Sequence, residues 1–135
     1  MKIQGRRDGF AHIRGGEEHA NTLQAANNYA WGLLGALRFE EAKALMRKIL
    51  PVARRFSGDD DENTLRMRLN YGQALCRADG ATLEDLREAV MTLEDTLRIA
   101  RRVLGGARPT TVDVEKSLQL SRAALAARET PSPSA

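Results

Sequence analysis

The residues that could carry chemistry are few and stand far apart in the sequence. The chain has two histidines, His12 and His19, and one cysteine, Cys76. Neither histidine lies at a spacing that would join it to a second metal ligand on one helix. A single cysteine excludes an internal disulfide framework and a cysteine-cluster metal site, and no histidine near it in the sequence would activate it as a nucleophile. We therefore predict that the chain is not an enzyme and holds no cofactor and no metal.

Two local patterns resemble ligand-binding motifs but lack residues that those motifs require. Residues 59–62 are four consecutive carboxylates, but an EF-hand loop would need glycine at Thr64 and a bidentate carboxylate at Asn70. The run instead suits the positive end of a helix that follows it. The glycine pairs at 15–16 and 105–106 lack the Lys-Ser/Thr of a phosphate-binding loop, so we interpret them as helix stops.

The elements that must position any functional side chain come from an internal repeat. Residues 16–23 match residues 58–65 at an offset of 42, and the Asn-Tyr pair at 28–29 matches that at 70–71. Five extra residues enter near 80–84, after which 53–58 matches 100–105 at an offset of 47. A third copy begins at Gly106. Repetition at this period is typical of stacked helical hairpins.

Each unit predicts two antiparallel helices. Apolar residues recur every three or four positions, and valine and isoleucine number only nine, too few for a β-rich core. We expect Asn21-Thr22 to cap the first helix, Thr82 and Asp85 to form a capping box, and a final helix to run from about Thr110 to Arg128. The prediction is an all-α, short right-handed α-solenoid of about two and a half repeats. Its units are 16–57, 58–105 and 106–128, preceded by a loose segment at 1–15 and followed by a disordered tail at 129–135.

The repeats resemble a known family. Gly-x-x-His-x-x-Thr-Leu-x-x-x-x-Asn-Tyr-Ala at 16–30, followed by Phe-Glu-Glu-Ala at 39–42, is similar to the 42-residue tetratricopeptide (TPR) repeats of kinesin light chains. Arg108-Pro-Thr-Thr-Val112 resembles the opening of such a unit. The resemblance implies that small residues such as Gly72 stand where two helices approach closely. It also implies that the first helix of each unit lines a concave groove for an extended peptide of a partner protein.

Carried over to this chain, the groove would be lined by ten residues. In the family an asparagine holds the peptide backbone, so the strongest candidates are Asn28 and Asn70, although each could instead bond a neighbouring helix or water. Arg66 and Arg77 would favour an acidic peptide, unless they are ordinary surface arginines. Trp31 could also belong to the core. The full set is Gln24, Asn27, Asn28, Trp31, Arg66, Asn70, Gln73, Arg77, Lys116 and Ser117.

The functional expectation is a non-catalytic adaptor or scaffold that binds a protein or peptide. A rival hypothesis is a basic helical repeat that binds nucleic acid, but 21 basic residues against 18 acidic ones give a net charge of only +3, and there are six aromatics. A third is a structural fragment of a longer array that self-associates through its exposed ends. Arginines along the groove would favour the peptide, and a stripe on the opposite face would favour nucleic acid. With no long apolar run, we expect no membrane span and a cytoplasmic protein.

Overall fold

The computed structural model describes residues 20–130, and the regular structure in this range is α-helical. The first helix occupies residues 20–35 of the range. It is followed by α2 (Phe39–Phe56), α3 (Glu62–Arg77), α4 (Leu83–Val103) and α5 (Pro109–Glu129). The predicted all-α class is confirmed. The loose segment predicted at 1–15 lies outside the described residues, as do 16–19 and residues 131–135 of the predicted tail. Glu129, which the prediction placed in that tail, belongs to α5. None of the described helices is long and apolar enough to cross a membrane.

The starts of α3 and α4 are set by side-chain caps, of which the one at α4 was predicted from the sequence. Asp61 is the N-cap of α3, and its carboxylate accepts hydrogen bonds from the backbone N–H groups of Asn63 and Thr64. At α4 the Thr82 hydroxyl accepts from the Asp85 N–H at 3.0 Å, and the Asp85 carboxylate accepts from the Thr82 N–H at 3.1 Å. This is the predicted capping box. Each contact satisfies a backbone donor that the helix itself cannot pair.

The ends of α2 and α4 are set by glycine. Gly58 and Gly105 adopt φ values of +93° and +87°, a conformation that side chains with a Cβ rarely adopt. The helix stop predicted at Gly105 is thus confirmed, and Gly58 ends α2 in the same way. The predicted cap at Asn21-Thr22 is wrong, because the helix already includes Ala20. A cap must lie before the first turn, so these two residues belong to the helix body.

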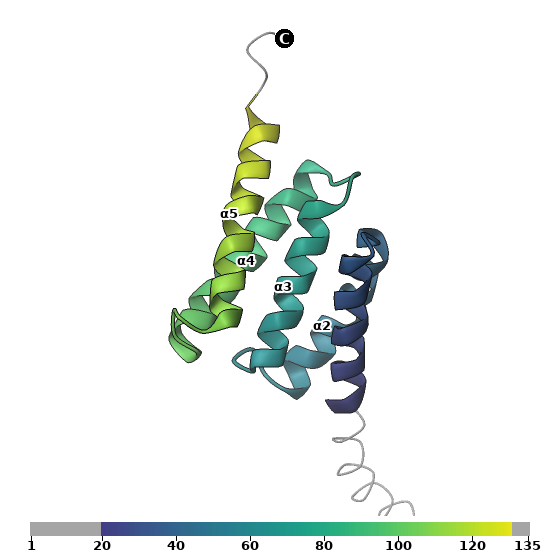
Figure 1. Ribbon diagram of the computed structural model, residues 1–135, viewed down its shortest axis with the longest axis vertical. Coiled ribbons are helices and arrows are strands. Elements are labelled where there is room, and N and C mark those ends of the chain that lie inside the picture. The colour runs from purple at the N-terminus through teal and green to yellow at the C-terminus, as the bar shows by residue number, and fades with distance from the viewer. Residues whose placement is uncertain (1–19, 131–135) are drawn as a thin grey trace, which may run out of the picture.

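The helices form two layers. In Figure 1 the first helix, α3 and α5 lie in the front layer, and α2 and α4 lie behind them. Each described helix from α2 onward packs on the next one along the chain, and α3 also packs directly on α5. The front layer therefore brings together three helices that alternate in the sequence. This is the arrangement that any groove across the front would need.

The core lies between the two layers and is filled mainly by aliphatic side chains. A close approach occurs between α3 and α4, where Gly72 faces Leu93. A Cβ added to Gly72 would lie 2.7 Å from Leu93 Cγ, so only glycine fits at this spacing. The prediction of a tight crossing at Gly72 is confirmed. The largest fully buried apolar side chains are Met46, Leu65, Met67, Leu69, Leu75, Leu93 and Val114.

Candidate peptide groove

Two adjoining cavities cross the front layer. One, of about 260 Å³, lies between the first helix and α3, and the other, of about 140 Å³, lies between α3 and α5. Gln73 and Arg77 line both cavities, so we treat them as one surface and call it the three-helix groove. Its lining residues are Trp31, Leu34, Gly35, Gln73, Cys76, Arg77, Ser117, Leu120 and Ser121.

Arg77 is the charged group at the centre of the groove. Its guanidinium lies over the Phe39 ring, 4.9 Å from the ring centroid, a cation–π contact that orients the side chain. Within residues 20–130 no carboxylate lies at ion-pair distance from Arg77, whereas most arginines of this range have one. The side chain is exposed. It can therefore donate parallel hydrogen bonds to an incoming carboxylate without breaking an existing pair.

Two large apolar side chains are exposed at the groove. Trp31 on the first helix is 59% exposed, and Leu120 on α5 is 69% exposed. Trp31 is thus not a core residue. Between them, Gln73 donates from Nε2 to Ser117 Oγ at 2.9 Å and links α3 to α5. The groove offers apolar contact at two edges and a cation between them, which suits a peptide with apolar and acidic side chains.

The two asparagines predicted as the strongest ligands do not line the groove. Asn70 is 4% exposed and donates from Nδ2 to Asn27 Oδ1 at 2.6 Å, between α3 and the first helix, and Asn27 is itself 8% exposed. The assignment of Asn70 and Asn27 to the groove is wrong, because two buried amides between packed helices satisfy each other. Asn28 is exposed but accepts from Gln24 Nε2 at 3.3 Å and lines neither cavity.

Of the remaining predicted residues, some line the groove and others lie outside it. Arg66 donates to Thr110 Oγ1 at 2.6 Å and lies 3.6 Å from an Asp113 carboxylate oxygen, so its charge already has partners on α5. Lys116 is exposed but lines neither cavity. Four of the ten predicted residues form the groove surface: Trp31, Gln73, Arg77 and Ser117.

Sequence reasoning missed Leu120 and Ser121, although a signal was present. They lie one turn beyond Lys116 and Ser117, so the spacing of three and four residues places them on the same face of α5. Leu34 and Cys76 also reach the groove. Within the described part of the chain no group of histidine, cysteine and carboxylate side chains could hold a metal ion.

The buried amide pair leads to a stability prediction. Asn70→Ala removes the hydrogen bond and leaves the buried Asn27 carbonyl without its donor, so we expect the free energy of unfolding to fall by about 2 kcal/mol. Asn28→Ala is the matched control and should change it by less than about 0.5 kcal/mol, because Asn28 is exposed. Urea denaturation followed by circular dichroism measures both. Equal effects of the two substitutions would contradict the structural role of Asn70.

A second polar network joins α2, α3 and α4. The Tyr71 hydroxyl donates to a Glu88 carboxylate oxygen and accepts from Arg47 Nε at 2.9 Å, and Tyr71 is 6% exposed. Burial, reinforced by the hydrogen bond to Glu88, raises the pKa of Tyr71 to about 12. Because its three members come from three helices, the network helps to hold the two layers together.

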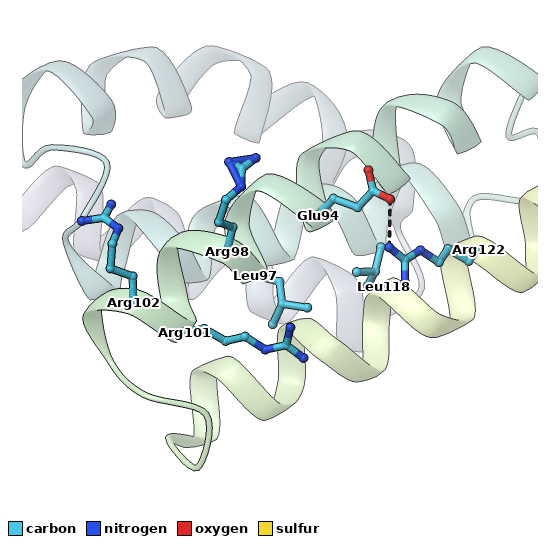
Figure 2. A pocket seen from close by; sticks show the side chains of 7 residues that line it. All are labelled: Glu94, Leu97, Arg98, Arg101, Arg102, Leu118 and Arg122. Atoms are coloured by element: carbon cyan, nitrogen blue, oxygen red, sulfur yellow. Dashed lines mark hydrogen bonds and ion pairs between the residues drawn. The ribbon is translucent and has the colours of Figure 1, made fainter.

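A larger cavity lies between α4 and α5. It has a volume of about 710 Å³ and is lined by Glu94, Leu97, Arg98, Arg101, Arg102, Leu118 and Arg122 (Figure 2). We call it the α4/α5 cleft. Arg122 bridges it to Glu94 at 2.9 Å. The other three arginines pair with carboxylates outside the lining: Arg98 with Asp95, Arg101 with Glu115 and Arg102 with Asp60.

Comparison with models of known protein families, with curated proteins and with solved structures finds no match to this chain. The function is therefore argued from the geometry of these surfaces.

Proposed function

We propose that the chain is a non-catalytic, TPR-like interaction module that binds an extended acidic peptide of a partner protein in the three-helix groove. The observation that carries the proposal is Arg77, a cation without a carboxylate partner in the described range, at the point where the two cavities meet. A peptide carboxylate there would gain two charge-assisted hydrogen bonds. Trp31 and Leu120 would contact apolar side chains of the peptide on either side.

The order of the helices supports a TPR-like arrangement. The first helix, α3 and α5 begin successive predicted units and share the front layer, while α2 and α4 share the other (Figure 1). A short right-handed solenoid would place the helices in this alternating order and would form its concave groove from the first helix of each unit. The prediction of a right-handed solenoid thus remains part of this proposal.

The location of the arginines also bears on the rival nucleic-acid hypothesis. The densest group lies at the α4/α5 cleft rather than along the groove, which by itself would favour a phosphate backbone. No aromatic side chain lines the cleft, however, so nothing in its lining could stack on the bases of a nucleic acid. We therefore retain a peptide, rather than a nucleic acid, as the proposed ligand.

The proposal is tested by selecting peptide ligands from a random display library. Peptides about ten residues long, roughly 33 Å when extended, are panned against the full chain. We expect the selected peptides to be enriched in aspartate and glutamate. Arg77→Ala and Trp31→Ala should each weaken their binding at least tenfold, about 1.4 kcal/mol, in fluorescence anisotropy titrations.

The matched control is Arg55→Ala, which removes an exposed arginine from α2. Its affinity for the selected peptides should equal that of the wild type. Peptides without an acidic bias, or peptides that bind Arg77→Ala as tightly as the wild type, would show that the groove is not the binding site.

A further inference from the structure

The α4/α5 cleft has a structural equivalent within the same chain. At the repeat offset of 47 residues, four of its lining positions correspond to residues that line a cavity of about 240 Å³ between α2 and α3. The corresponding pairs are Leu50 and Leu97, Pro51 and Arg98, Arg54 and Arg101, and Tyr71 and Leu118. Leu97 and Leu118 pack in one apolar cluster, as Leu50 and Tyr71 do in another. The two grooves are therefore built alike.

The groove between α2 and α3 is closed by a third helix. Glu88 and Thr92 of α4 line the same cavity, and the Glu88 carboxylate accepts from Tyr71 and pairs with Arg47 at 3.5 Å. A second α4 carboxylate, Asp95, pairs with the buried Arg68 of α3 at 2.6 Å. The covering helix thus supplies carboxylates to cations of the groove it covers.

No helix of the described range covers the α4/α5 cleft. Among α2 to α5, the last helix packs only on α3 and α4. The position that α4 holds relative to α2 and α3 therefore has no counterpart among these helices on the far side of α5.

The cleft also differs from the covered groove in charge. Arg98 stands where α2 has Pro51, and Arg122 stands where α3 has Leu75. The lining consequently has four guanidinium groups and one carboxylate, Glu94 (Figure 2). An occupant of the cleft would meet more guanidinium groups than α4 meets at its own groove, which Arg54 and Arg68 line.

We propose that the α4/α5 cleft is the docking site for an acidic amphipathic helix of a partner protein, separate from the three-helix groove. The helix takes the position relative to α5 that α4 takes relative to α3. Its apolar side chains cover Leu97 and Leu118, and its carboxylates pair with the arginines of the rim.

The existing ion pairs do not block such docking. The side chains of Arg98, Arg101 and Arg122 are 68%, 55% and 55% exposed, and their pairs with carboxylates are also open to water. Exposed ion pairs contribute little to stability, so the arginines can turn toward an arriving carboxylate at small cost. A carboxylate that docks in the cleft loses water and therefore pairs more strongly than one on the open surface.

The test uses a synthetic helix as the probe. A fluorescein-labelled peptide of about 20 residues, roughly 30 Å as a helix, carries leucines and alanines on one face and glutamates beside them. Its binding to the full chain is measured by fluorescence anisotropy. We expect saturable binding that weakens at least tenfold when the glutamates of the probe are replaced by glutamine, and at least tenfold in the double variant Arg98→Ala/Arg101→Ala.

Two control variants test whether the probe binds at another surface of the protein. Lys48→Ala/Arg55→Ala removes the same charge from exposed positions of α2 and should bind the probe as the wild type does. Arg77→Ala should also bind it normally, so the result does not depend on the three-helix groove.

Three results would overturn the proposal. The first is that the glutamine probe binds as tightly as the glutamate probe. The second is that the glutamate probe fails to bind while a single-stranded oligonucleotide binds and loses affinity in the Arg98/Arg101 variant, which would make the cleft a nucleic-acid site. The third is a dimer in analytical ultracentrifugation that the same variant dissociates, which would make a second copy of the chain the occupant.

Discussion

Gly72→Ala is expected to lower the free energy of unfolding by about 2–3 kcal/mol. The added Cβ would lie 2.7 Å from Leu93 Cγ and 2.8 Å from Leu93 Cδ2. Leu93 is fully buried, and its apolar cluster includes Leu69 and Val90, so it has no space into which to move. The crossing of α3 and α4 must therefore widen, and contacts along both helices are lost. Urea denaturation monitored by circular dichroism measures the change.

The matched control is Gly32→Ala on the first helix. A Cβ at Gly32 would meet no heavy atom within 4 Å, and the residue is exposed. Alanine forms helix more readily than glycine, so this variant should gain about 0.5–1 kcal/mol. The two glycine-to-alanine changes are thus expected to have opposite signs. A stabilised Gly72→Ala protein would mean that α3 and α4 do not cross at this distance.

The second large effect is a loss of stability at high pH that depends on Tyr71. Its pKa is raised to about 12 in the folded protein, mainly by burial, whereas an unfolded tyrosine titrates near 10. The protonated phenol is thus favoured by folding. This contribution is complete below about pH 10 and is lost as the pH rises toward about 12, for a total of up to about 3 kcal/mol.

The measurement compares wild type with Tyr71→Phe, which cannot form a phenolate at this position. Urea denaturation is followed at several pH values between about 9 and 12. Other groups that titrate in this interval are common to both proteins, so the difference between the two pH dependences isolates Tyr71. Identical slopes of unfolding free energy against pH would show that burial and the hydrogen bond to Glu88 do not hold the Tyr71 hydroxyl protonated.

Most helix boundaries can be predicted from the sequence because they depend on contacts between residues that are close together in the chain. Asp61 reaches backbone groups two and three residues ahead, and Thr82 and Asp85 satisfy each other across one turn. Such contacts exist whatever the helix packs against. The exception is the start of the first helix, where the predicted capping pair lies inside the helix.

The lining of the groove could be predicted only in part, because equivalent residues of two repeat units can have different neighbours in the folded protein. Asn28 and Asn70 occupy equivalent positions at the offset of 42, but α3 packs against the first helix, so its asparagine meets Asn27 and is buried. The first helix has no preceding helix in the described range, and Asn28 stays exposed. Arg66 and Arg77 look alike in the sequence, yet only Arg66 has carboxylate and hydroxyl partners on α5.

The sequence by itself determined that the chain forms paired helices and where most of them end. These properties follow from periodicity and from contacts within a few residues, which the order of amino acids specifies directly. Only the tertiary structure decided which polar side chains pair with one another and which stay open to a ligand. That depends on which helices become neighbours, and it selected Arg77 rather than Asn70 for the groove and brought four arginines from α4 and α5 to one cleft.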